Sequence, residues 1–166
     1  MDILTNIIES DSNHCLATWH ETLIPIWWGP ARAQDVVRMG DAALALLRAR
    51  RGPAHLLLVI EPTSPPPVGD VLDAFARFSR DVVSKLGVAV AVAEGGGFRA
   101  ASIRSVAAAL ALVLPNRLPY KFVDTVEAGA ALLAPHLSPA AGGSLGLLRA
   151  VDSLRKHTAG SRRAGG

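Results

Sequence analysis

The sequence predicts an α/β domain with a mostly parallel sheet of about five strands. Two continuous apolar runs carry this prediction, HLLLVI over residues 55–60 and VAVAVA over residues 88–93. Unbroken apolar runs are typical of parallel strands that are buried on both faces. Each run is followed by a segment with apolar residues at the i, i+3, i+4 spacing of a helix. Strands that alternate with such helices favour a parallel sheet.

The predicted elements follow one another in order along the chain. Strands are expected over residues 14–20, 22–28, 55–60, 88–93 and 120–123. Helices are expected, each from its apolar stripe, over about 31–51, 68–86, 103–114 and 124–137. Together these elements make one domain over residues 14–137, which a polar lead-in over residues 1–13 precedes.

Turn and capping residues support the element boundaries. Glu21 lies between the first two strands, at a tight turn. Pro25 removes a ladder donor, which favours an edge position or a bulge for the second strand. Gly52 and Pro53 end the first helix. The sequence Asp124-Thr-Val-Glu fits a capping box at the start of the last helix.

Composition and charge exclude several classes of protein. The 166 residues are 50% hydrophobic and 19% charged, which is typical of a globular chain. A single cysteine, Cys15, excludes an intramolecular disulfide and a multi-cysteine zinc site. The first residues are acidic, unlike a secretory signal, and no apolar run reaches the roughly 18 residues of a membrane span. We therefore expect a cytoplasmic protein without a membrane span.

The positive charge of the chain is concentrated near its C-terminus. One acid, Asp152, opposes five basic residues there, namely Arg149, Arg155, Lys156, Arg162 and Arg163. The remainder of the chain is close to neutral, so its net charge does not indicate nucleic-acid binding. We expect residues 138–166 to form a basic, partly disordered tail with a short helix over 144–156.

The order of elements resembles the STAS and SpoIIAA-like domains of bacteria over residues 14–137. Three local patterns carry the resemblance, IEPTSPPP over 60–67, VAEGGGFRAA over 92–101 and KFVDTVEA over 121–128. The resemblance implies a sheet with helices chiefly on one face. It also implies a non-enzymatic regulatory or protein-binding module of bacterial signalling, without a cofactor. Because a fold hosts many functions, two alternatives stay open, a small-molecule or lipid-binding domain and an enzyme of unknown type.

The same resemblance implies candidate phosphoacceptors and a class of partner. In known members, the loop after the third strand carries a serine that a partner kinase phosphorylates at a helix start. Thr63 and Ser64 fall at about that place, although the Asp-Ser-Ser-Gly turn of those members is absent. The expected partner is a regulatory kinase or another signalling protein, and a homodimer is the alternative.

Residues 14–20 hold the three residues most typical of a metal or nucleophile site. Strand alternation places His14 and His20 on one face and Cys15 on the other. The two histidines are separated by roughly 20 Å of strand, which is too far for one metal ion. We therefore predict no metal site and no catalytic set, and we interpret Cys15 as a core thiol.

Two loops are expected to lie side by side where neighbouring parallel strands end. Glu61 and Glu94 follow these strands, at the edge where open α/β sheets bind ligands. Beyond Glu94, a turn predicted to bind an anion or a partner contains Gly95, Gly96, Gly97 and Arg99. The sequence has neither the G-x-G-x-x-G nor the G-K-[ST] pattern of nucleotide sites. Ordinary connections between strands and helices are the alternative.

Two adjacent tryptophans are candidates for an interface. Trp27 and Trp28 face opposite sides of a strand. One ring is expected in the core, and the other is expected at a contact with a partner or a second copy, because large aromatic side chains are enriched at such contacts. The alternative is that the second ring covers the sheet edge.

Overall fold

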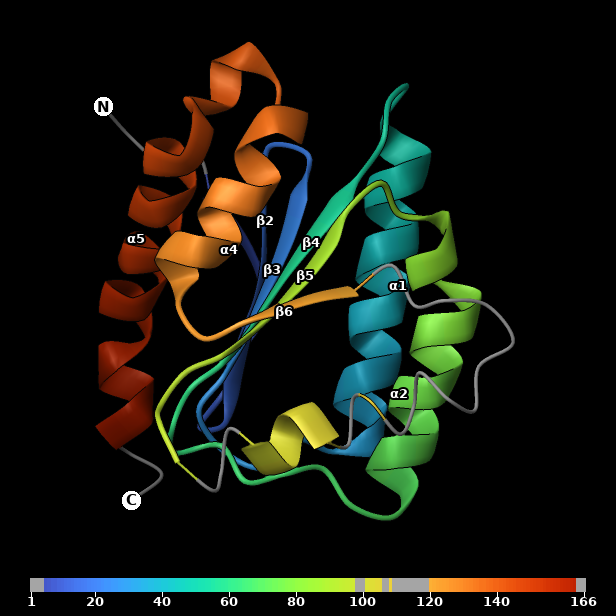
Figure 1. Ribbon diagram of the computed structural model, residues 1–166, viewed down its shortest axis with the longest axis vertical. Coiled ribbons are helices and arrows are strands. Elements are labelled where there is room, and N and C mark those ends of the chain that lie inside the picture. The colour runs from blue at the N-terminus through green and yellow to red at the C-terminus, as the bar shows by residue number, and fades with distance from the viewer. Residues whose placement is uncertain (1–4, 98–100, 106–107, 109–119, 164–166) are drawn as a thin grey trace.

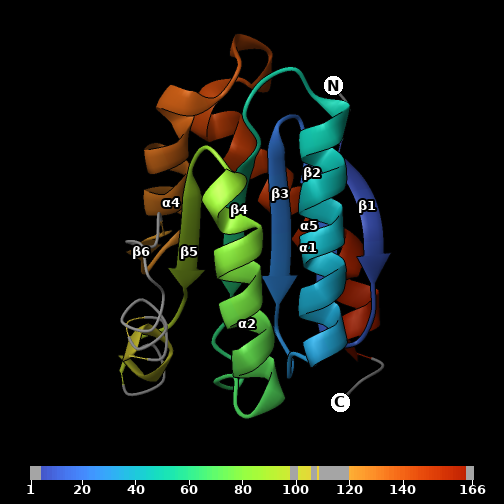
Figure 2. The same cartoon turned by 90° about the vertical axis from the view of Figure 1, so that its right-hand side faces the viewer.

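The computed structural model describes residues 5–97, 101–105, 108 and 120–163, and these residues form a three-layer α/β arrangement (Figures 1 and 2). Its six-stranded sheet has the strands in chain order. The strands are β1 (Thr5–Ser10), β2 (His14–Trp19), β3 (Thr22–Trp27), β4 (His55–Ile60), β5 (Ala89–Ala93) and β6 (Tyr120–Val123). The first three pair antiparallel, and β3 to β6 pair parallel. The predicted α/β class with a mostly parallel sheet is confirmed.

Helices cover both faces of the sheet. The helices α1 (Ala33–Ala49) and α2 (Asp70–Asp81) lie on one face, while α4 (Val126–Leu133) and α5 (Gly143–Arg163) lie on the other (Figure 1). There are also the short helical turns η1 (Val83–Lys85), η2 (Ala134–His136) and η3 (Pro139–Ala141). Residues 101–105 are helical as well, and most of the helix predicted over 103–114 lies outside the described residues. The expectation of helices chiefly on one face is wrong. The central strands β3, β4 and β5 are buried along nearly their whole lengths, so both faces require a cover.

Residues 5–10 were expected to belong to a lead-in outside the domain, and this expectation is wrong. They form β1, which pairs antiparallel with β2 at the edge of the sheet. The residues of β1 alternate between partly buried and exposed side chains. A half-exposed edge strand therefore has a mixed polar composition, unlike the continuous apolar runs of the central strands.

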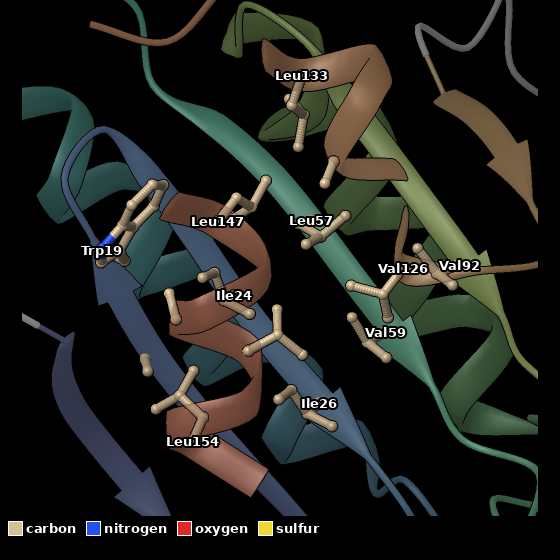
Figure 3. Close-up of a cluster of buried hydrophobic side chains, with 14 of the residues drawn as sticks. Trp19, Ile24, Ile26, Leu57, Val59, Val92, Val126, Leu133, Leu147 and Leu154 are labelled. Atoms are coloured by element: carbon tan, nitrogen blue, oxygen red, sulfur yellow. The ribbon is translucent and has the colours of Figure 1, made fainter. Parts of the chain in front are cut away.

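The C-terminal segment also differs from the expected tail, because residues 143–163 form the long helix α5. Its buried residues recur at helical spacing, at Leu147, Ala150, Val151, Leu154 and Thr158. They pack against the sheet beside α4, as Figure 3 shows for Leu147 and Leu154 next to Trp19, Ile24 and Ile26. The basic residues of the segment lie between these apolar positions, so a charged composition conceals an amphipathic helix.

Two details of the elements depart from the sequence prediction. Pro25 lies in a central strand, and the pairing of β3 with β4 skips residues 24 and 25, where proline has no N–H to donate. The N-cap of α4 is Thr125, whose Oγ1 accepts from the Ala128 amide at 3.1 Å. Asp124 instead forms an ion pair with Arg104.

The alternation of β5 separates two hydrophobic cores. Val90 and Val92 face α4 and α5, whereas Ala89 and Ala91 face α1 and α2. The side of the sheet beneath α2 therefore carries the smaller side chains of this strand. No helix among the described residues has the length and apolarity that crossing a membrane requires.

Candidate functional site

An apolar pocket lies at the carboxyl ends of the parallel strands, on the face that α1 and α2 cover. Its volume is about 70 Å³, several times the roughly 10–15 Å³ that holds one water molecule. Leu58 and Ile60 of β4, Ala91 and Ala93 of β5, and Phe75 of α2 contribute to its wall. This place is where open α/β sheets bind ligands.

Small side chains in β5 account for the space. The alternating sequence AVAVA directs its alanines to the α2 side of the sheet. Ala91 and Ala93 are buried and line the pocket, opposite Phe75 and Ser79 of α2. Phe75 and Ser79 are four residues apart, so they lie on the same face of the helix. Larger residues at the two alanine positions would fill the space, as Val90 and Val92 do in the other core.

Polar groups in the pocket wall are few and uncharged. Ser79 Oγ donates to the Phe75 carbonyl at 2.8 Å and lies 3.3 Å from Tyr120 Oη. Burial raises the pKa of Tyr120 above its ordinary value, so its hydroxyl stays protonated. Among the described residues, none accepts a hydrogen bond from the buried Trp27 Nε1. The pocket lining of described residues includes no charged side chain.

The loop over residues 61–67 is tied to the end of β3 beside the pocket. Thr63 Oγ1 donates to the Trp28 carbonyl at 2.7 Å, and Ser64 Oγ donates to the Gly29 carbonyl at 3.0 Å. Ser64 is 3% exposed, so a kinase would reach its hydroxyl only after the loop had detached. The phosphoacceptor role of Thr63 and Ser64 stays a prediction, and in this structure both hydroxyls hold the loop in place.

The two carboxylates predicted at the strand ends do converge, and arginines of α5 bind them. Arg155 spans both, with Nε 2.9 Å from Glu61 Oε1 and Nη2 2.6 Å from Glu94 Oε2. Arg162 binds Glu61 at 2.6 Å, and its guanidinium lies 4.1 Å from the centre of the Trp28 ring. Burial lowers the pKa of Arg155, but the hydrogen bond and charge of Glu94, with those of Glu61, raise it above the ordinary value overall. This cluster fastens α5 to the sheet.

The glycine turn after β5 lies beside the loop that follows β4, as predicted. A Cβ placed on Gly95 would lie 3.2 Å from Pro62 side-chain atoms. Gly95 and Gly97 have φ angles of 94° and 87°, in the region that favours glycine. Gly96 is exposed. Arg99 lies outside the described residues, so the predicted anion site stays a prediction.

Both tryptophans of the predicted interface are buried within the chain. Trp27 belongs to the core beneath α1 and α2, and Trp28 belongs to the opposite core, so their predicted opposite orientation is confirmed. Their exposed fractions are 2% and 7%, and Trp28 Nε1 donates to the Ser12 carbonyl at 2.6 Å. The expectation that one ring is exposed for contact is wrong. Helices on both faces of the sheet place both orientations inside the molecule.

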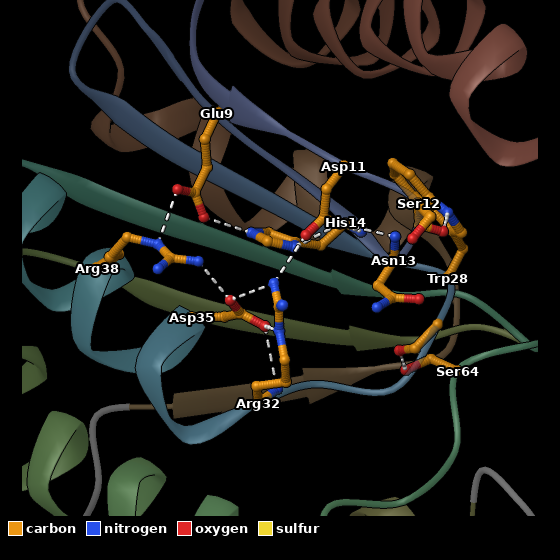
Figure 4. Close-up of polar contacts among 11 residues, drawn as sticks. Glu9, Asp11, Ser12, Asn13, His14, Trp28, Arg32, Asp35, Arg38 and Ser64 are labelled. Carbon is orange, nitrogen blue, oxygen red and sulfur yellow. Dashed lines mark hydrogen bonds and ion pairs between the residues drawn. The ribbon is translucent and has the colours of Figure 1, made fainter. Parts of the chain in front are cut away.

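A charged network that the sequence analysis did not identify lies around His14 (Figure 4). The Nε2 atom of His14 lies 2.7 Å from Glu9 Oε1, and its Nδ1 lies 3.1 Å from Asp11 Oδ1. Asp35, buried at the start of α1, binds Arg32 at 2.9 Å and Arg38 at 2.6 Å. The sequence separation of these residues conceals the network, because they come from β1, β2, α1 and the turns that flank them.

Three residues of this network have the composition of a metal site. Glu9, His14 and Asp35 each offer one ligand atom, and these atoms lie within 4.8 Å of one another. Arg38, however, binds both Glu9 and Asp35, at 2.8 and 2.6 Å. The carboxylate charges that a cation would neutralise already have guanidinium partners. The network therefore ties β1 and β2 to α1.

Comparisons with known proteins add no assignment to these sites. No protein-family model, no curated protein and no solved structure matches the chain. The similarity to STAS domains therefore rests on sequence patterns and on the order of elements, and it stays a hypothesis. The functional argument rests on the sites themselves.

Proposed function

We propose that this domain binds a small, largely apolar molecule in the pocket beneath α2. The observation that carries the proposal is an apolar pocket at the carboxyl ends of β4 and β5, where the strand sequence places alanines. Sites for small molecules are concave, mostly apolar and provided with few polar groups. This proposal makes the small-molecule alternative of the sequence analysis the leading function.

The surroundings of the pocket favour a preformed site. Hydrogen bonds from Thr63 and Ser64 hold one rim to the end of β3. Pro65 and Pro67 of the same loop line the pocket and restrict its backbone. A rim that is already ordered lowers the entropy cost of binding.

A regulatory module that binds a protein partner is the second candidate. The observation that favours it is apolar surface beside the pocket, where Phe122 of β6 is 38% exposed and Val68, next to Pro67, is 71% exposed. Exposed apolar side chains at one place are typical of interaction sites. In this proposal a signalling protein, or a second copy of the chain, covers the mouth of the pocket. Co-purification from the native host, with mass spectrometry of proteins and small molecules, separates the two candidates.

Filling the pocket tests the leading proposal. Ala93→Leu adds bulk where β5 meets the pocket, and Ala141→Leu adds the same bulk to the opposite core as a matched control. Naphthalene serves as the probe, and saturation-transfer NMR with titration measures its affinity. We expect saturable binding to the wild type and to Ala141→Leu, and a loss of at least about tenfold in Ala93→Leu. Absence of saturable binding to the wild type, or equal binding to a folded Ala93→Leu protein, would contradict the proposal.

A further inference from the structure

We infer that the pocket selects a flat, uncharged aromatic molecule with fused rings, which lies on the alanines of β5 and against Phe75 of α2. The inference rests on the proposed function, because it names the class of molecule that the same pocket holds and the surface on which that molecule lies. Three observations carry it, namely the register of the strands, the position of the aromatic side chains and the absence of charge from the described lining.

The register of the strands places the alanines of β5 between longer side chains. Ala91 pairs with Leu58 of β4 on one side and with Phe122 of β6 on the other. Ala93 pairs with Ile60 of β4. Paired residues of neighbouring strands direct their side chains to the same face of the sheet, so the short methyl groups lie lower than their neighbours. All five residues line the pocket, and together they form an alanine trough in its wall.

The alanine trough has room along β5 for more than a single ring. Ala91 and Ala93 are two residues apart, so their Cβ atoms are separated by roughly 7 Å along the strand. Phe75 lines the same pocket from α2, which covers this face of the sheet (Figure 2). A flat molecule with fused rings therefore lies lengthwise along β5, with one face on the alanine methyls and the other toward Phe75.

Aromatic side chains are concentrated around the alanine trough. The chain has three Trp, one Tyr and four Phe residues, and Trp27, Phe75, Tyr120 and Phe122 line this one pocket. The rings of Trp27 and Phe75 meet edge to face with their centres 6.2 Å apart, and those of Tyr120 and Phe122 lie 5.8 Å apart. Contacts between aromatic rings contribute more than burial of the same area alone. An aromatic guest gains this contribution from the wall, and a saturated guest does not.

The electrostatic character of the pocket excludes a charged group from its interior. The described lining includes no Lys, Arg, His, Asp or Glu side chain. The arginines of α5 at the carboxyl edge of the sheet already bind Glu61 and Glu94. A charged group inside the pocket would lose its water without gaining a counter-ion, which is costly. The part of the guest that lies in the pocket is therefore uncharged.

Naphthalene and tetralin form a matched pair of probes for this inference. They share one fused carbon skeleton, but in tetralin one of the rings is saturated and puckered. The additional hydrogens of tetralin enlarge its apolar surface, so hydrophobic transfer alone would favour tetralin. In titrations followed by saturation-transfer NMR, we expect the wild type to bind naphthalene about threefold to tenfold more tightly, the contribution of one aromatic contact.

Phe75→Leu tests the contact that the inference assigns to α2. The change removes the aromatic ring opposite the alanine trough and keeps an apolar side chain. The preference for naphthalene should fall below about twofold, while tetralin binding remains. Phe78→Leu is the matched control, because it makes the same change in the same helix at a buried residue outside the described lining, and it should keep the preference.

A second measurement uses the wild-type protein and does not depend on the folding of a variant. Protons of bound naphthalene should give nuclear Overhauser effects to the methyl groups of Ala91 and Ala93, which line the pocket. The methyl groups of Val90 and Val92 belong to the opposite core and should give none.

The outcomes separate this inference from the proposed function. A wild type that binds tetralin as tightly as naphthalene, or more tightly, would overturn the selection of a flat molecule and leave the proposed function intact. A preference that persists in folded Phe75→Leu would overturn the role of Phe75. Bound naphthalene without Overhauser effects to Ala91 and Ala93 would overturn its placement on β5. Failure of both probes to bind would contradict the proposed function itself.

Discussion

Burial sets the chemistry of two side chains that commonly serve as catalysts. Cys15 is fully buried, and burial raises the pKa of its thiol to about 11. A thiol that stays protonated is a poor nucleophile, which agrees with the interpretation of Cys15 as part of the core.

His55 is also buried, and both nitrogens of its ring have partners. Its Nδ1 accepts from the Val88 amide at 3.0 Å, and its Nε2 lies 3.2 Å from the His136 carbonyl.

The environment of His55 makes stability depend on pH. Burial lowers the pKa of His55 below its ordinary value, so the folded chain favours the neutral ring. As the pH falls through about 6.5, the unfolded chain binds a proton at this residue that the folded chain does not bind. We expect the free energy of unfolding to fall as the pH falls through this range, and to recover as the pH rises.

Urea unfolding between pH 5.5 and 7.5 measures this dependence. His55→Asn should give a shallower pH dependence than the wild type, because the titrating ring is absent. His157→Asn, which replaces an exposed histidine on α5, is the control and should follow the wild-type profile. A His55→Asn profile parallel to that of the wild type would show that another group causes the dependence.

At the scale of elements, α5 is the part of the fold whose role differs most from the sequence prediction. Leu154 is 1% exposed in the core against the sheet, whereas Leu145 of the same helix is 56% exposed. Leu154→Ala should lower the free energy of unfolding by about 2–5 kcal/mol, through lost burial and the cavity that remains. Leu145→Ala should change it by less than about 0.5 kcal/mol. Chemical denaturation of both variants checks this, and a Leu154→Ala protein as stable as the wild type would mean that α5 is not part of the core.

The sequence predicted the interior strands well but missed β1 and the long helix α5, for a physical reason. The interior strands β2 to β5 all lie within segments predicted as strands, because such strands are nearly continuous apolar runs. The edge strand β6 also matches its predicted segment, 120–123. The edge strand β1 has the mostly polar sequence TNIIES, in which polar and apolar residues do not alternate, and α5 mixes charges with its apolar stripe. The polar composition of the first segment indicated a lead-in, and the basic composition of the second indicated a tail. The 3.6-residue spacing of its apolar residues would have identified α5, whereas β1 has no alternation of polar and apolar residues that indicates a strand.

The sequence predicted half of the arrangement at the carboxyl edge of the sheet. Glu61 and Glu94 follow neighbouring parallel strands, so their convergence follows from topology. Their partners Arg155 and Arg162 lie far along the chain, and no local pattern indicates that α5 crosses this edge. The pocket was likewise not predicted, although the alternation of Val and Ala in β5 was its signal.

At the scale of the whole molecule, the sheet separates two layers with different roles. On one face, α4 and α5 cover a core that valine and leucine fill, and ion pairs from α5 to Glu61 and Glu94 close its edge. On the other face, α1 and α2 cover smaller alanine side chains and leave the apolar pocket. The filled core supports the sheet from one face, and the pocket lies on the other face. This division is the physical basis of the proposed binding function.

The central claim is that a small apolar molecule occupies the space beneath α2, and a crystal structure with 1-bromonaphthalene tests it most directly. Anomalous scattering locates the bromine atom independently of the shape of the remaining density. The account predicts a bromine peak between Phe75 of α2 and Ala93 of β5, and no such peak in crystals of the Ala93→Leu protein. Crystals of the wild type with no bromine in this pocket, or with bromine only at surface positions, would contradict the account.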